Sequence, residues 1–426
     1  MNDSTTSSTT VDVTDAAGLA PDLRARLALR LLTSLRVGEL EVIYPDRSTR
    51  VYRGRNTASA PAHAMHRAQL EIHDFKALSM AVSRGDIGFG EGYMQGLWST
   101  PNLSALLRLL TANRESIASA IYGQWWATLM DQLRHLLRSN RKARSRKNIA
   151  AHYDLGNAFY STWLDPTMTY SSALFDTTGG WDREVDLMAG QHRKMDRAIG
   201  QLALDPKDPG QRVLEIGCGW GGLAQRLLRQ HACQYKGLTL STEQQSWAQS
   251  HLRSCDATGR WSVALQDYRD EAGQFDGIVS IEMFEAVGER YWDAYFSTLA
   301  KCLTPMGRAV IQTIVIRDPL FERYRRGTDF IQRYIFPGGM LPSANVFESC
   351  AHRHGLRVID RFHFGQDYGR TLAEWLKRFD AQRSAIDALG FDVRFQRMWR
   401  FYLAYCEAGF AEGDVDVIQF TLAPDR

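Results

Sequence analysis

The sequence predicts an α/β protein in two parts, a small α+β unit followed by a doubly wound domain with a mostly parallel sheet. Three observations support this prediction. A short apolar strand at 212–216 runs into a glycine-rich turn, 217–222, and then into an amphipathic helical pattern. Strand and helix patterns alternate from residue 148 to the end of the chain. Just before this change, residues 134–147 contain seven basic residues and no acidic one.

Length and composition indicate an ordinary globular chain. The 426 residues suffice for two domains, and a net charge of +3 is too small to indicate a nucleic-acid-binding protein. The six cysteines show no metal-ligand spacing, so we expect no metal site. The Ser- and Thr-rich first twenty residues have no signal-peptide pattern, and no stretch approaches the roughly 20 apolar residues of a spanning helix. We therefore expect a disordered leader and a cytoplasmic protein.

The predicted domains are a leader at 1–20, a small accessory unit at 21–133, a basic linker at 134–147 and a larger domain at 148–426. In the accessory unit, helical patterns at 75–83 and 103–113 flank the glycine-rich residues 85–93, which we expect to form a loop. Its Glu91 and Tyr93 are candidates for site residues, but loop and packing roles are the favoured interpretation. The basic linker is either a solvated segment or a patch for anionic lipid headgroups, where each basic residue contributes on the order of 1 kcal/mol.

The larger domain carries the alternating pattern of a doubly wound sheet. Strands are predicted at 212–216, 234–240, 261–265, 275–281, 308–316, 356–362 and 416–422, with helices at 222–231, 242–252, 289–303 and 345–355.

The residues around the glycine turn indicate which cofactor it serves. A dinucleotide site needs an acidic residue near the end of the second strand, but 237–241 reads Gly-Leu-Thr-Leu-Ser and no acid occurs before Glu243. Glu215 stands just before the turn, and Asp267 and Tyr268 follow the third strand. This arrangement favours S-adenosylmethionine, with its amino acid part near the glycines and its adenine between the second and third strand ends.

Several motifs of the larger domain then match one family. They are His-Tyr-Asp-Leu-Gly-Asn at 152–157, Asp-Pro-Thr-Met-Thr-Tyr-Ser-Ser-Ala at 165–173, the glycine turn, Ser-Ile-Glu-Met-Phe-Glu-Ala-Val-Gly at 280–288, and the stretches 334–343, 364–368 and 399–410. The chain resembles the cyclopropane-fatty-acid synthases, S-adenosylmethionine-dependent enzymes that modify the cis double bond of acyl chains in membrane phospholipids. The resemblance covers roughly 148–426 and implies a Rossmann-like class I methyltransferase domain. The first unit resembles the accessory lipid-facing domain of longer members.

The resemblance also implies roles for individual residues. Cofactor contacts are expected from Tyr170, Ser171, Gly217, Gly219, Gly221, Thr239, Gln244, Asp267, Tyr268 and Ile281. Catalytic positions are Glu285, Tyr368, Ser172, Gln312 and Ile314, around a bicarbonate that removes a proton from the added methyl group. Many bacterial members have cysteine at position 172 and histidine at positions 312 and 286, whereas this chain has Ser172, Gln312 and Ala286. Plant members share these substitutions. Hydroxyl and amide groups still donate hydrogen bonds to an anion, and bicarbonate binding stays open.

The implied reaction is methylene transfer to the cis double bond of unsaturated phospholipid acyl chains, which forms a cyclopropane ring. The alternative is methylation without ring closure, giving a methyl-branched or methyl-unsaturated chain. The carbocation could be stabilised by the aromatic faces of Tyr170, Phe284 and Tyr368. The segment 319–339 forms either an acyl-chain tunnel with its membrane-facing lid or part of the core packing. A peripheral location at the inner face of the membrane is expected, and a homodimer stays open. A soluble small-molecule methyltransferase and a non-catalytic lipid-binding protein are the competing hypotheses.

Overall fold

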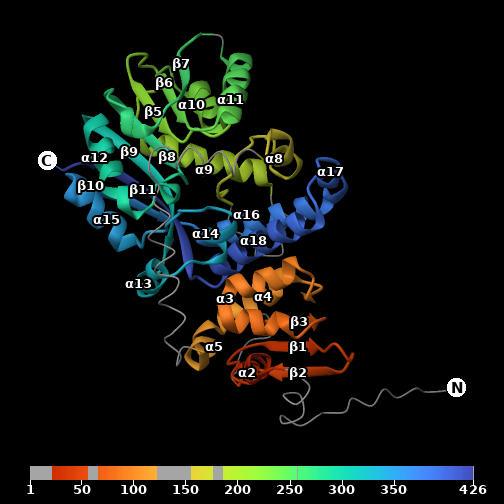
Figure 1. The fold of residues 1–426 in the computed structure, drawn as a ribbon. Coiled ribbons are helices and arrows are strands. Elements are labelled where there is room, and N and C mark those ends of the chain that lie inside the picture. The colour runs from red at the N-terminus through yellow and green to blue at the C-terminus, as the bar shows by residue number, and fades with distance from the viewer. Residues whose placement is uncertain (1–21, 56–65, 122–154, 176–185, 257, 426) are drawn as a thin grey trace. The chain divides into compact units, whose positions relative to one another are not determined.

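The computed structural model describes residues 22–55, 66–121, 155–175, 186–256 and 258–425 (Figure 1). Their contacts divide the chain into two compact units. The first unit comprises the described residues up to 121 together with 392–408, and the second unit comprises the remaining described residues. The predicted leader at 1–20, the basic linker at 134–147 and the first three residues of the 152–157 motif lie outside the described residues.

The first unit is built on a sheet with the strand order β2-β1-β3-β4. The central strand β1 pairs antiparallel with β2 and parallel with β3, and its alternate residues Leu40 and Val42 are fully buried. This alternation is expected for a sheet with one face against a core. The elements are α2 (Leu23–Leu32), β1 (Glu39–Ile43), β2 (Thr49–Arg53), β3 (Arg67–Ile72), α3 (Lys76–Met94), β4 (Trp98–Ser99), α4 (Leu103–Ala112), α5 (Arg114–Ile121) and most of α18 (Val393–Ala411).

The glycine-rich residues 85–93 are helical, so the prediction of a loop there is wrong. Helix α3 continues through them after a kink at Arg84 and Gly85, where Gly85 has φ +58°. The glycines permit a close approach, because a Cβ at Gly88 would lie 2.0 Å from the Met80 carbonyl oxygen. Glu91 is buried and forms an ion pair with Arg84, which agrees with its expected packing role.

Helix α18 joins the first unit through residues 392–408, although the sequence predicts this segment as part of the larger domain. Polar contacts fix its position. The Arg400 guanidinium donates to the Tyr93 hydroxyl at 2.8 Å, and the Tyr405 hydroxyl donates to Asp86 at 2.9 Å. These partners are about 300 residues apart in the chain, and no local sequence pattern reports such a pairing.

The second unit contains a seven-stranded sheet with the order β10-β11-β9-β8-β5-β6-β7. Strands β5 to β9 are parallel, and β11 pairs antiparallel with both β9 and β10. This mostly parallel α/β architecture confirms the predicted fold class and the predicted terminal strand. The strands are β5 (Arg212–Ile216), β6 (Gln234–Thr239), β7 (Trp261–Leu265), β8 (Phe275–Ile281), β9 (Leu303–Ile316), β10 (Leu356–His363) and β11 (Val415–Pro424).

Helices cover both faces of this sheet (Figure 1). On β5, Val213 belongs to one buried cluster together with residues of α9, α10 and α11, whereas Leu214 belongs to the other, with residues of α12 and α15. Fully burying each such side chain contributes about 1.5–3 kcal/mol. The helices of this unit are α8 (Asn157–Trp163), α9 (Leu187–Gln201), α10 (Gly222–Gln230), α11 (Thr242–Cys255), α12 (Trp292–Cys302), α13 (Asp318–Arg326), α14 (Phe330–Tyr334), α15 (Ala344–Arg353), α16 (Gly365–Ala381) and α17 (Arg383–Ala388), with the short 3₁₀ helices η3 (Tyr268–Asp270), η4 (Phe284–Ala286) and η5 (Glu289–Tyr291).

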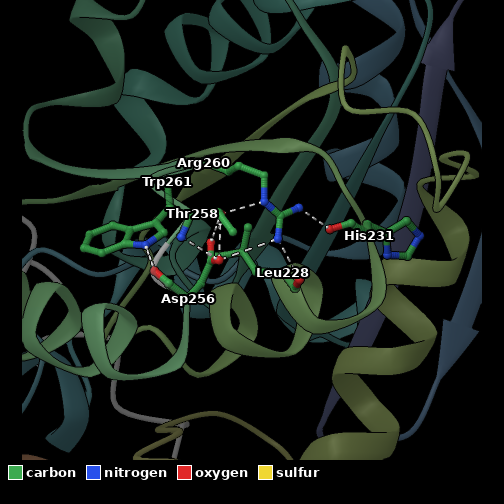
Figure 2. A network of polar contacts seen from close by, with 6 residues as sticks. All are labelled: Leu228, His231, Asp256, Thr258, Arg260 and Trp261. Carbon is green, nitrogen blue, oxygen red and sulfur yellow. Dashed lines mark hydrogen bonds and ion pairs between the residues drawn. The ribbon is translucent and has the colours of Figure 1, made fainter.

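A polar network around Arg260 joins the end of α10 to the turn before β7 (Figure 2). The guanidinium donates to the backbone carbonyls of His231 and Leu228 at 2.9 and 3.3 Å, and to the Thr258 hydroxyl at 2.8 Å. Thr258 in turn donates to Asp256. The last carbonyls of a helix lack intrahelical partners, so Arg260 satisfies two of them and fixes the β6–β7 edge beside α10.

Among the helices that the structure describes, none is long and apolar enough to cross a bilayer.

Candidate active site

The glycine turn links β5 to α10 through residues with left-handed backbone conformations. Gly217, Gly219 and Gly221 have φ values of +85°, +51° and +88°. A Cβ at Gly217 would lie 2.8 Å from Cγ of Met283, so a side chain there would displace its neighbour. The amides of residues 217 and 218 both donate to the Leu238 carbonyl at 2.9 Å. At its glycines, the turn therefore presents bare backbone at the start of a helix.

A cavity of about 160 Å³ lies at this end of the parallel strands. It is the expected position for a ligand of a doubly wound sheet, beyond the carboxyl ends of the strands. All predicted cofactor contacts except Gly221 line it: Tyr170, Ser171, Gly217, Gly219, Thr239, Gln244, Asp267, Tyr268 and Ile281. Gly221 is instead the N-cap of α10, where a Cβ would lie 3.3 Å from that of Ala248.

Side-chain hydrogen bonds organise the polar wall at the ends of β6 and β7. The Thr239 hydroxyl donates to the Gln244 amide oxygen at 2.9 Å. Arg269 donates to both oxygens of Asp267, at 2.8 and 2.6 Å. Burial raises the pKa of the Tyr268 phenol, which therefore stays neutral. This wall offers hydroxyl, amide and carboxylate groups to a polar ligand.

Two buried ionisable residues, Lys194 and Glu215, line the cavity. Lys194 on α9 is 1% exposed, and its ammonium donates to the Ser171 hydroxyl at 2.6 Å. Burial lowers the pKa of Lys194 to about 8, against the opposing effect of Glu282, Asp165 and Glu215. Burial also raises the pKa of Glu215 to about 7, although Tyr235 donates to its carboxylate at 2.5 Å. Several carboxylates are therefore near enough to favour the charged form of the ammonium.

Glu282 forms the centre of a second cluster, directly after β8. Its backbone is in the left-handed region at φ +48°, an uncommon conformation for a residue with a side chain. One carboxylate oxygen, Oε1, accepts from the Ser172 backbone N–H at 2.9 Å and from the Gln312 amide at 2.7 Å. The other oxygen, Oε2, accepts from the Tyr368 hydroxyl at 2.5 Å. Three donors thus hold one half-buried carboxylate at the cavity wall.

Glu285 is the second carboxyl group of this cluster, which we call the carboxylate centre (Glu282, Glu285 and their donors). Its Oε1 accepts from the Ile314 backbone N–H at 2.5 Å and from the Thr313 hydroxyl at 3.1 Å. Its Oε2 is buried, with no hydrogen-bond partner among the described residues. Burial, followed by the neighbouring charge of Glu282, raises the pKa of Glu285 to about 8. Glu285 is therefore mainly protonated at neutral pH.

Comparison with known proteins assigns the chain to a family. The family described as mycolic acid cyclopropane synthetase matches residues 140–420. The chain belongs to this family. It is 38% identical over 404 residues to a tuberculostearic acid methyltransferase of Mycobacterium tuberculosis, covering 93% of this chain and 90% of that protein. It is 34% identical over 358 residues to the cyclopropane-fatty-acyl-phospholipid synthase of Escherichia coli, covering 83% and 87%.

A solved structure supports the same assignment. The mycolic acid cyclopropane synthase CmaA1, complexed with SAH and CTAB, has a TM-score of 0.59 and 33% identity, covering 65% of this chain and 97% of that one. The resemblance predicted from the motifs is confirmed, as is the enzyme class: this family consists of S-adenosylmethionine-dependent methyltransferases.

The structure brings the five predicted catalytic positions together, but it divides them between two carboxylates. Tyr368, Gln312 and Ser172 contact Glu282, whereas Ile314 contacts Glu285. Ser172 contributes its backbone N–H, because its hydroxyl donates to the neighbouring Ala173 carbonyl at 2.9 Å. The groups expected to hold a bicarbonate thus already donate to a carboxylate of the protein. They do not fit a bound bicarbonate while Glu282 occupies this position.

Three residues of the site are absent from the sequence prediction. Glu282 carries a signal, because it is an acidic residue directly after a parallel strand and within the 280–288 motif. Lys194 and Gln419 carry none. Gln419 on β11 reaches the site only through the fold, where its amide donates to the Gln312 side-chain oxygen at 2.9 Å.

The aromatic candidates have different environments. Tyr170 lines the cavity and packs against Trp163 and Trp375, with ring centroids 5.5 and 5.3 Å apart. Phe284 is fully buried in the core, stacked on Trp292 at 5.6 Å. Phe321, in the segment 319–339, belongs to the same core cluster. Core packing therefore accounts for Phe284 and for this part of the segment.

Proposed function

We propose that this enzyme transfers a methyl group from S-adenosylmethionine to the cis double bond of an unsaturated acyl chain. The observation that carries the proposal is the shared wall of the site. Glu282 lines the cavity behind the glycine turn and also belongs to the carboxylate centre. A methyl donor and a proton acceptor would thus meet at one place.

The cavity fits S-adenosylmethionine, which when bound supplies an electrophilic methyl group. Gly217 and Gly219 would lie under its methionine part, where the absence of a Cβ leaves bare backbone and permits their positive φ values. Thr239 and Gln244 would contact the ribose side, and Asp267 with Tyr268 the adenine side. Tyr170, Ser171 and Ile281 would complete the pocket. Gly221 would act by shaping the start of α10.

The reaction requires a shielded site because an alkene is a weak nucleophile. Its π electrons form the new bond to carbon and leave a cation on the acyl chain, which water would trap. Tyr170 offers an aromatic face to a cation without reacting with it. A base must then accept a proton, and the carboxylate centre supplies the candidate groups.

Ring closure is the first product we propose. Loss of a proton from the added methyl group lets its C–H electron pair close a cyclopropane. The second candidate is methylation without ring closure, favoured by 38% identity to a tuberculostearic acid methyltransferase. A hydride shift along the chain before proton loss gives a methylene group without any further reactant. A saturated methyl branch would require hydride from a separate reductant.

The proposed substrate is the acyl chain of a phospholipid, reached by peripheral association with the inner membrane face. The support is that the relative from Escherichia coli is named for this substrate class and aligns with 83% of the chain. The basic linker at 134–147 would add electrostatic attraction to anionic headgroups.

Incubation of the full chain with oleoyl-phospholipid vesicles and methyl-labelled S-adenosylmethionine tests the proposal. We expect label in the lipid, and proton NMR of the product distinguishes a ring from a methylene. Vesicles of fully saturated phospholipid are the matched control and should remain unlabelled. Absence of lipid-linked label, or methylation of a soluble amine in its place, would contradict the proposal.

A further inference from the structure

We propose that the Glu282 carboxylate is itself the base of the reaction and takes the place of a bound bicarbonate. This inference rests on the proposed function, because it assigns the proton-removal step of that reaction. It follows from the mismatch noted above: Ser172, Gln312 and Tyr368 were expected to hold an external anion, yet all three donate to Glu282. A carboxylate and a bicarbonate present the same planar pair of oxygens to such donors.

The donor geometry leaves Glu282 able to accept one more hydrogen. An ionised carboxylate has about four lone-pair positions. Oε1 uses two of them for Ser172 and Gln312, whereas Oε2 accepts from Tyr368. Oε2 thus retains a lone pair, and Glu282 lines the cavity that also contains the predicted cofactor contacts.

A second set of contacts fixes the orientation of the Gln312 amide. Gln419 donates to the Gln312 side-chain oxygen at 2.9 Å, so the Gln312 nitrogen must face Glu282. Arg197 donates to the Gln419 oxygen at 2.9 Å and thereby orients that amide in turn. A chain of three side chains thus directs an N–H group at Glu282, which is the arrangement that an acceptor carboxylate needs.

The charge distribution also suits an ionised group at this position. The Lys194 ammonium is near enough to stabilise the Glu282 carboxylate, and Tyr368, Ser172 and Gln312 act in the same direction, although burial raises the pKa of Glu282 overall. A base with a raised pKa accepts a proton more readily near neutral pH than an ordinary carboxylate does. Glu285, with its pKa raised to about 8, serves as the neutral partner.

The step balances without another reactant. A C–H bond of the added methyl group breaks, and its electron pair forms the closing carbon–carbon bond or, after a hydride shift, a carbon–carbon double bond. The proton moves to Oε2 of Glu282, which becomes neutral and later releases the proton to water. The positive charge of the acyl cation is thus cancelled as the proton leaves.

Replacement of Glu282 by glycine is a suitable test because the fold should tolerate it. The residue has φ +48°, which glycine adopts without strain, and the removed side chain leaves space for a small anion. Glu282→Gln is the paired variant, since its amide fills the space but cannot accept the proton. Ala203→Gly is the matched control, because it also places glycine at a positive φ, +53°, but in the exposed turn after α9.

Lipid labelling is measured for all four proteins in carbonate-free buffer and again with millimolar bicarbonate. We expect wild type and Ala203→Gly to be equally fast in both buffers. Glu282→Gln should be at least about 100-fold slower in both, the usual contribution of a general base. Glu282→Gly should be as slow without bicarbonate and recover at least about 10-fold with it. Unchanged binding of S-adenosylhomocysteine verifies that both variants keep the cofactor site.

Two results overturn the assignment: wild-type labelling that requires bicarbonate, or a Glu282→Gln variant as fast as wild type. Wild type that labels no lipid in either buffer instead overturns the proposed function. The two failures are therefore distinct.

Discussion

The cofactor cavity and the carboxylate centre share one end of the sheet but are constructed from different parts of the chain. At the glycine turn the cavity takes its shape from backbone in one continuous stretch, the end of β5 and the glycines at 217–222. The carboxylate centre takes its shape from groups of separate segments: the side chains of Glu282, Gln312 and Tyr368 and the backbone N–H of Ser172. One region depends on local conformation, and the other on tertiary packing.

The free-energy cost of forming each region differs accordingly. A left-handed conformation costs a residue with a Cβ roughly 1–2 kcal/mol, and glycine avoids that cost. The carboxylate centre must remove Glu282 and Glu285 from water, and an unpaired buried charge would cost several kcal/mol. Lys194, the donors to Glu282 and the protonation of Glu285 offset that cost. A glycine change should therefore affect cofactor binding, whereas changes in the centre should alter proton chemistry.

The largest effect is expected from Gly217→Val. A branched side chain at φ +85° is strained, and its Cβ would lie 2.8 Å from Met283. We expect S-adenosylhomocysteine affinity to fall at least about 100-fold, equivalent to about 2.7 kcal/mol, by isothermal titration calorimetry. Gly200→Ala is the control, since a Cβ there meets no atom within 4 Å. Equal affinities of the two variants would show that the turn does not hold the cofactor.

Lys194→Met should have the next largest effect, because the Lys194 charge acts on Glu282 in the carboxylate centre. Loss of the ammonium removes the charge that favours ionised Glu282, so the pKa of Glu282 should rise further. The acidic limb of the pH–rate profile should move to higher pH by about one unit or more, with a roughly 10-fold lower rate at neutral pH. Lys236→Met is the control, because Lys236 pairs with Glu271 at 2.7 Å. An unshifted profile for Lys194→Met would separate Lys194 from the proton chemistry.

The same contrast explains which parts of the molecule the sequence predicts. The strand, glycine turn and helix at 212–231 depend on local patterns, so β5 and α10 agree with the prediction. The contacts of Ile314 with Glu285 and of Gln419 with Gln312 join segments that meet only in the folded sheet. Periodicity and motifs locate such residues on strands, but they do not report which donor reaches which acceptor.

The glycine-rich residues 85–93 are a case in which the local sequence pattern predicts the wrong structure. Glycine lowers helix propensity by about 1 kcal/mol relative to alanine, which favours a loop. The structure has a helix there because packing prevails: Phe89 stacks on Trp98 at 4.2 Å, and Gly88 allows contact with Met80. Local propensity alone is therefore a poor guide where closely packed helices require small residues.

Glu285→Gln provides a smaller, pH-dependent effect in the carboxylate centre. The folded-state pKa of about 8 exceeds the ordinary value of 4.5, so the folded state favours the protonated form. The stability linked to that proton is complete below pH 4.5 and is lost as the pH rises toward 8. Glutamine cannot ionise, so the variant does not lose this stability. The Tm of the variant minus that of wild type should therefore rise by about 2 °C or more between pH 5 and pH 8.5.

The matched control for that measurement is Glu322→Gln, which changes a glutamate of α13 with a 60% exposed side chain. Its Tm difference from wild type should be the same at both pH values. A pH-independent difference for Glu285→Gln as well would contradict the raised pKa.

The smallest effect is expected from Ser172→Ala, which tests whether the donor to Glu282 is backbone or side chain. The backbone N–H of Ser172 contacts Glu282 at 2.9 Å, and the hydroxyl donates to the Ala173 carbonyl. Removal of the hydroxyl should therefore lower the lipid-labelling rate by less than about 3-fold, whereas Tyr368→Phe, which deletes a side-chain donor to the same carboxylate, should lower it about 10-fold or more. A larger loss for Ser172→Ala than for Tyr368→Phe would return the hydroxyl to the catalytic role expected from the family. The expected smaller loss for Ser172→Ala would mean that at this position the carboxylate centre, like the glycine turn of the cofactor cavity, depends on backbone. Replacement of cysteine by serine at position 172 would then leave the donor to Glu282 unchanged.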